Sequence, residues 1–168
     1  MNKLKKFLAI TMLTASVFYT GGAEESALKE KSPLEVYRAG SQKSFQGPEN
    51  LFTGNVQVDM LFPANDTAHY SGAYVTFQPG ARTAWHSHPA GQHMIVTSGK
   101  GLTGTRDGNI VEFQESDVVW CPVDTDHWHG ATPDSAMTHL VVTGVLDGKN
   151  VVWKDKVTDE QYRGKPAR

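Results

Sequence analysis

The feature that most constrains this chain is a series of short β-rich runs separated by turn residues. The runs cover 55–62, 69–77, 84–88, 92–98, 102–106, 110–113, 118–122, 127–131 and 137–146. Several are separated by strong turn formers, namely Pro79-Gly80, Gly99-Lys100-Gly101, Asp107-Gly108 and Asp147-Gly148. Many short strands at this spacing predict an all-β fold, either a sandwich or a small barrel.

Size and charge are those of one globular domain. The chain has 168 residues, of which 39% are hydrophobic and 20% charged, and this length suffices for a substantial core. Thr158, followed by Asp159 and Glu160, predicts the N-cap and first turn of a short C-terminal helix. The formal charge of −2 comes without clustered Lys or Arg, so we expect no nucleic-acid partner.

Residues 1–23 have the pattern of an export signal. Lys3, Lys5 and Lys6 precede a mostly apolar run over 7–18, and small residues follow it immediately before Glu24. An apolar run of about a dozen residues is too short for a membrane-spanning helix, which takes about 20. We therefore predict a cleaved signal peptide and a periplasmic or secreted protein with no membrane partner.

The mature chain is expected to have a flexible lead-in over residues 24–35 and a single domain over 36–168. Loss of the three leader lysines changes the formal charge from −2 to −5. Cys121 is the single cysteine, so an exported form has no internal disulfide. We expect it to be buried as a small hydrophobic residue, with an exposed reactive or intermolecular thiol as the alternative.

The histidines follow a metal-ligand pattern. His86 and His88 are separated by one residue, as are His127 and His129, and alternate residues of a strand point to the same face. Gln92 lies between the two pairs and offers an amide oxygen. A single histidine would more often be a satisfied core or surface residue. Two His-x-His pairs with an intervening glutamine predict a divalent metal site.

The same residues resemble the cupin family. Its first motif is matched by Gly80-x5-His86-x-His88-x3-Gln92-x6-Gly99, and its second by Asp117-x4-Pro122-x4-His127. The resemblance implies a double-stranded β-helix barrel whose metal is held by His86, His88, Gln92 and His127. Gln replaces the usual Glu of the first motif. The second motif has Asp117 and Asp124 where glycine is usual, so the turn before His127 must be built differently.

Most of the mature chain is also similar to the bacterial, manganese-dependent cupin hydroxynitrile lyases. The similar segments are 40–42, 52–54, 79–86, 88–92, 127–131, 137–140 and 157–162. Such enzymes cleave cyanohydrins to an aldehyde and HCN, or run the reverse. The resemblance implies that His129, His139 and Thr83 line the site. Thr143 stands where those lyases carry Gln.

Three imidazoles and a neutral amide would leave a divalent metal its full charge, which favours Lewis-acid chemistry. Mn(II) is the metal that the resemblance implies, and Fe(II), Ni(II) or Zn(II) also suit such ligands. His129 or His139 would accept a proton from a small-molecule substrate, or would instead orient the ligands. Three functions stay open: a lyase, an iron-dependent oxygenase, and a binding protein without catalysis.

The remaining aromatic and basic residues are assigned to packing or to the surface. Trp85, Trp120 and Trp128 alternate out of phase with the histidine ligands, so we expect core or interface aromatics. Exposed aromatic residues and the family resemblance together predict a homo-oligomer. Arg82 is expected to point outward into an exposed ion pair, and His93 to face away from the site.

Overall fold

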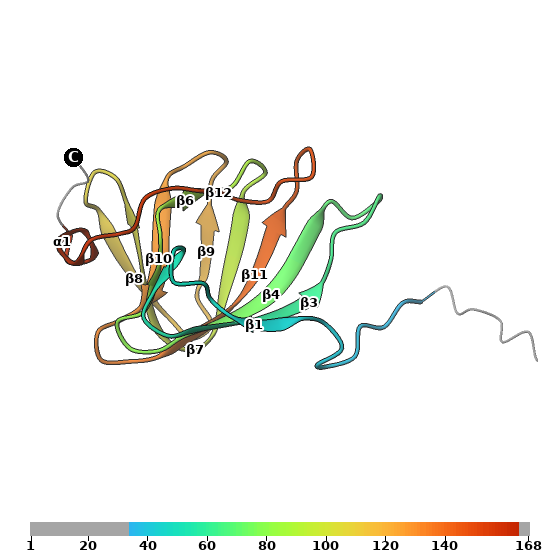
Figure 1. Ribbon diagram of the computed structural model, residues 1–168, viewed down its shortest axis with the longest axis horizontal. Coiled ribbons are helices and arrows are strands. Elements are labelled where there is room, and N and C mark those ends of the chain that lie inside the picture. The colour runs from blue at the N-terminus through green and yellow to red at the C-terminus, as the bar shows by residue number, and fades with distance from the viewer. Residues whose placement is uncertain (1–33, 165–168) are drawn as a thin grey trace, which may run out of the picture. The chain divides into compact units, whose positions relative to one another are not determined.

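The computed structural model describes residues 34–164, and the regular structure in this range is almost entirely β-strand (Figure 1). The strands are β1 (Ser44–Gln46), β2 (Phe52–Thr53), β3 (Val56–Phe62), β4 (Tyr70–Phe77), β5 (Arg82–Thr83), β6 (His86–Ser87), β7 (Gln92–Thr105), β8 (Ile110–Gln114), β9 (Val118–Cys121), β10 (His127–Ala131), β11 (Met137–Gly144) and β12 (Val152–Trp153). One short helix, α1 (Asp159–Tyr162), follows them. The all-β prediction with a C-terminal helix is confirmed. The predicted signal peptide lies outside the described residues.

The strands form one curled antiparallel sheet in which β7 joins two halves (Figure 1). The first part of β7 pairs with β11 and β9, and its last part pairs with β10 and β8. The sequence predicted two strands here, separated by a turn at Gly99. The structure instead has one strand that bends at this residue, where φ is +77° and an added Cβ would lie 1.9 Å from the carbonyl oxygen of Ala136. Only glycine fits this bend.

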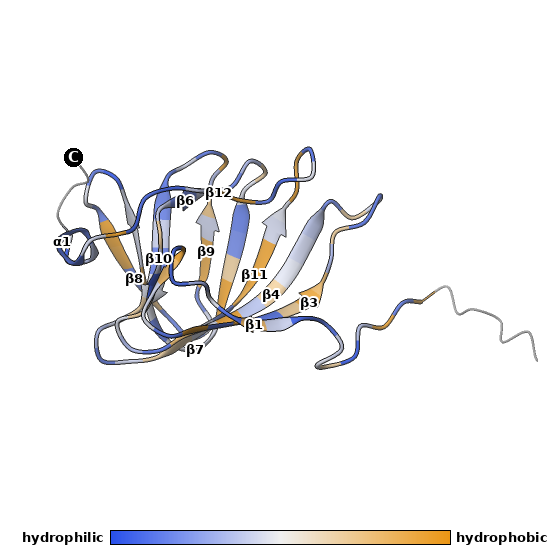
Figure 2. Cartoon of the chain, in the orientation of Figure 1, coloured by the Kyte–Doolittle hydropathy of each residue, from blue (hydrophilic) through white to orange (hydrophobic). Residues whose placement is uncertain are grey.

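The core lies on the concave side of the sheet, where alternate strand residues point inward. In β11 every second residue is buried, starting at Met137, and most of its inward neighbours from β3, β4 and β7 are apolar. In Figure 2 the orange of hydrophobic residues is seen along β3, β9 and β11. Cys121 belongs to this core, as predicted, and burial raises the pKa of its thiol to about 12. No helix within residues 34–164 is long and apolar enough to cross a membrane.

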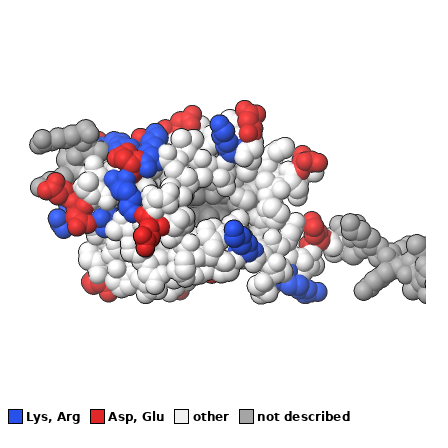
Figure 3. All heavy atoms as spheres, in the orientation of Figure 1, with Lys and Arg blue, Asp and Glu red and all other residues white. Residues whose placement is uncertain are grey.

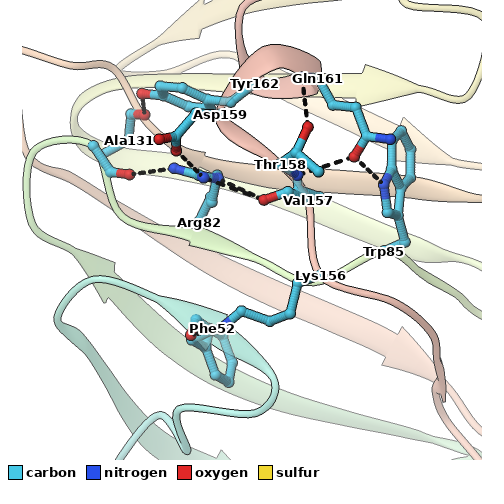
Figure 4. Close-up of polar contacts among 11 residues, drawn as sticks. Phe52, Arg82, Trp85, Ala131, Lys156, Val157, Thr158, Asp159, Gln161 and Tyr162 are labelled. Carbon is cyan, nitrogen blue, oxygen red and sulfur yellow. Dashed lines mark hydrogen bonds and ion pairs between the residues drawn. The ribbon is translucent and has the colours of Figure 1, made fainter. Parts of the chain in front are cut away.

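The C-terminal segment covers the outer face of the other half of the sheet. Trp85 and Trp128 are buried there against Val157 and Tyr162. The helix begins as predicted: the Thr158 hydroxyl accepts the backbone N–H of Gln161, and the Gln161 side chain accepts the N–H of Thr158 (Figure 4). The Gln161 side chain also accepts the indole N–H of Trp85 at 3.0 Å. Two of the three predicted core or interface tryptophans thus have their outer faces covered by the chain itself.

Arg82 forms an ion pair as predicted, but its side chain is buried rather than exposed. Its guanidinium lies beneath α1, where it donates to the Val157 carbonyl and to Asp159 and stacks 4.8 Å from the Tyr162 ring (Figure 4). The outward direction was correct, but the C-terminal segment covers that side of β5. The ion pair to Asp159, 2.6 Å long, therefore holds the tail against the sheet.

Removing the Tyr162 hydroxyl tests how strongly the tail is held. This buried hydroxyl donates to the Ala131 carbonyl at 2.7 Å. Tyr162→Phe leaves that carbonyl unpaired, so we expect the free energy of unfolding in urea to fall by about 1–2 kcal/mol. Tyr70→Phe is the matched control, since Tyr70 is about half exposed. Equal stability of the two variants would contradict this account.

Candidate metal centre

Five histidines from three strands and one loop meet in the curled sheet. His86 begins β6 and lies directly opposite His127 of β10, with ring centroids 4.3 Å apart. His88 follows β6, and its ring lies 5.0 Å from His86 and 5.3 Å from His127. His129 of β10 lies 5.1 Å from His86, and His139 of β11 lies 4.9 Å from His129. The alternation predicted from the two His-x-His pairs is confirmed, although β6 ends before His88.

Backbone carbonyls orient the three histidines that were predicted as ligands. Nδ1 of each ring lies close to one carbonyl oxygen: 3.0 Å from Ala84 for His86, 2.6 Å from Asn150 for His88, and 2.9 Å from Thr125 for His127. A carbonyl can only accept, so each Nδ1 carries the proton and each Nε2 keeps its lone pair. This is the tautomer in which Nε2 is free to bind a metal.

Gln92 lines the same cavity as His86 and His88. Its Nε2 donates to the Thr143 hydroxyl at 2.8 Å, while its Oε1 is buried without a hydrogen-bond partner. The Nε2 atoms of His88 and His127 are likewise buried and unpartnered. Unpaired buried acceptors are costly, and a cation would satisfy all three. The residues predicted from sequence therefore fit a divalent metal.

Among the described residues, one group of three histidines has ring nitrogens that all lie within 4.8 Å of one another: His86, His127 and His129. His88, which was predicted to be a ligand, lies outside this group. His129 was predicted to be a catalytic residue rather than a ligand. Its position in the structure allows either role. Its Nδ1 lies 3.2 Å from Nε2 of His139, so that nitrogen is engaged away from the other two rings.

His139 lies behind His129 rather than in the cavity. It is fully buried and packs on Phe77, whose ring centroid is 5.6 Å away. Its Nε2 faces His129, and its Nδ1 is without a partner. The family resemblance implied that both histidines line the site. Here His129 lines the cavity, and His139 contacts the His129 ring from the side of the core.

Burial keeps these imidazoles neutral. Desolvation is the largest cause in each case: it lowers the pKa of His88 and His139 to about 4 and holds the pKa of His86 and His129 well below the ordinary value. The pKa of His127 is also lowered by burial. Neutral imidazoles can bind a cation or accept a proton at neutral pH.

A cavity of about 260 Å³ opens beside this group. The polar side is formed by Thr83, His86, His88, Gln92, His129 and Thr143, and the apolar wall includes Phe45, Leu51, Phe52, Val58, Met60, Val75, Val141 and Trp153. Figure 3 shows a hollow on this face, surrounded mostly by uncharged residues. The Thr83 hydroxyl accepts the backbone N–H of His129 at 3.1 Å, which leaves its own O–H free to donate to a ligand.

Two contacts at this site were missed by the sequence reasoning. Trp153 of β12 packs 4.9 Å from the His86 ring, and Asn150 orients His88 through its backbone carbonyl. A carbonyl contact has no side-chain signature, so no sequence signal could have found it. The unusual turn before His127 is built with Asp124 in the left-handed region, at φ +55°, and its N–H donates to the His88 carbonyl at 3.0 Å.

The chain is similar in sequence to known proteins. A cupin domain model matches residues 73–143. The chain is 54% identical over 130 residues to a protein named (R)-mandelonitrile lyase from Granulicella tundricola. The matched residues cover 77% of this chain and 99% of that protein.

Solved structures share the fold. A cupin-like protein from Thermotoga maritima is 38% identical, with a TM-score of 0.67 over 73% of this chain and 94% of that one. A predicted oxalate decarboxylase from the same organism is 19% identical, with a TM-score of 0.57 over 67% of this chain and 100% of that one, which shows likeness of fold alone.

The buried neutral histidines make the metal-free protein sensitive to acid. His139 has its pKa lowered to about 4, whereas an unfolded histidine titrates near 6.5. Between these values the unfolded chain binds a proton that the folded chain does not, so stability falls as the pH falls from about 6.5 toward 4. We expect this residue alone to contribute about 3 kcal/mol to the change in unfolding free energy.

Urea unfolding across that pH range measures the effect. His139→Gln removes one titrating group and should flatten the dependence. His69→Gln makes the same change at an exposed histidine and serves as the control. The same slope in His139→Gln and wild type would show that His139 is not buried in its neutral form.

Proposed function

The chain belongs to the cupin family, and on that premise we propose that it is an exported metal-dependent lyase that cleaves a small cyanohydrin to an aldehyde and HCN, or forms it in reverse. The single observation that carries the proposal is the group of unpaired histidine and glutamine acceptor atoms at the polar side of an apolar cavity. The 54% identity to a protein named (R)-mandelonitrile lyase supports the choice of reaction.

The metal would be held by His86, His88, Gln92 and His127, whose acceptor atoms face one place. Mn(II) is our first choice, with Fe(II), Ni(II) or Zn(II) as alternatives, because all of them accept such nitrogen and oxygen ligands. When bound, a divalent cation held by neutral ligands supplies Lewis-acid stabilisation of negative charge on an oxygen.

The chain's own residues supply the proton transfers. His129 is neutral and lines the cavity, so its free nitrogen can accept the substrate hydroxyl proton. The electron pair of that O–H bond forms the carbonyl, and the pair of the C–C bond leaves with cyanide, which takes a proton to give HCN. Thr83 can donate a hydrogen bond to the substrate oxygen. The apolar wall excludes water from the reacting atoms.

His139 supports His129 rather than meeting the substrate. With Nε2 of His139 3.2 Å from Nδ1 of His129, one ring nitrogen must donate and the other accept. This contact fixes the orientation of the His129 ring. When His129 takes a proton at its far nitrogen, both its nitrogens become donors, and His139 can then accept from Nδ1. A neutral His139 thus keeps one hydrogen bond to His129 after the proton transfer, which offsets part of the cost of a buried charge.

Export is proposed from the leader. Its basic start, apolar run and small residues before Glu24 fit a signal peptide, and they support a periplasmic or secreted mature protein.

Replacing the proposed base tests the function. We expect the metal-loaded protein to release cyanide from mandelonitrile, and His129→Ala to lower the rate by about 100-fold or more because proton transfer loses its acceptor. Cyanide release and oxygen uptake are measured on the same samples of wild type and His129→Ala. The metal content of both proteins is determined as well.

His69→Ala is the matched control, since this histidine is exposed and lies outside the site. Unchanged cyanide release in His129→Ala at equal metal content would rule out His129 as the base. Oxygen uptake without cyanide release would indicate an oxygenase instead of a lyase. The absence of both activities would indicate a binding protein without catalysis.

A further inference from the structure

Thr143 has a defined place opposite the proposed ligand Gln92. The two residues are direct cross-strand partners in the pairing of β11 with β7, and their side chains point to the same concave face. Both are only 5% exposed. The Gln92 amide nitrogen donates to the Thr143 hydroxyl at 2.8 Å, and this bond is fully buried.

The amide has two different ends, and only one suits a cation. Its oxygen bears the negative partial charge and is buried without a partner, as are the Nε2 atoms of His88 and His127. If the oxygen binds a metal, the N–H groups must find an acceptor elsewhere, because a buried donor without a partner is costly. The Thr143 hydroxyl is that acceptor.

We propose that Thr143 is a positioning residue, which holds the Gln92 amide with its oxygen toward the metal by accepting its N–H. This rests on the proposed metal site but not on the lyase reaction. The hydroxyl acts through Gln92 and needs no contact with the metal.

Manganese(II) binding to the metal-free protein tests the proposal without any substrate. Thr143→Val keeps the shape of the side chain and removes the acceptor, so we expect Mn(II) affinity to weaken about tenfold. Thr143→Ser restores the hydroxyl and should restore the affinity. Thr138→Val is the control, since Thr138 lies on the same strand with its hydroxyl against Thr76 on the outer face.

A second pair of variants separates positioning from general damage to the site. In a Gln92→Ala background there is no amide to hold, so adding Thr143→Val should leave Mn(II) affinity unchanged. Wild-type affinity in Thr143→Val alone would overturn the proposal, as would an equal loss in both backgrounds. Weaker binding in Thr143→Val, together with no cyanide release from wild type, would keep this role while removing the proposed reaction.

Discussion

The rest of the structure depends on one constraint: five imidazoles are buried together, and Asp126, near His127, is the one carboxylate within the described chain that acts on any of them. Desolvation forces them to stay neutral, and neutral rings need defined partners for their N–H groups. For three of the rings these partners are backbone carbonyls: Ala84 for His86, Thr125 for His127 and Asn150 for His88. The price of this arrangement is a set of unpaired lone pairs pointing inward, which a bound cation would offset.

The fold meets this constraint through strand alternation and one bent strand. Because β7 bends at Gly99, it pairs with β11 in one half of the sheet and with β10 in the other. The bend brings His139 of β11 against His129 of β10, and the pairing of β11 with the first part of β7 places Gln92 opposite Thr143. The C-terminal tail then covers the outside of β10, so that the strand carrying His127 and His129 is buried on both faces.

The residues of the site were largely predictable, because they follow local rules. Alternation along a strand placed His86 with His88 and His127 with His129 on common faces, and the structure confirms that these rings share one site. Burial of Arg82 was not predictable, because it depends on a tail 75 residues further along the chain. The position of His139 behind His129 was missed for a similar reason: it depends on how β10 and β11 approach across the core.

By itself, the sequence determined the class of fold, the helix cap at Thr158 and which side chains could bind a metal, since these depend on spacing and residue type. The tertiary structure decided which atoms of those side chains face the cavity. It assigned the His88 tautomer through the Asn150 carbonyl and the Gln92 amide orientation through Thr143. Both contacts join residues more than 50 positions apart, and no local pattern encodes the direction of a hydrogen bond across that separation.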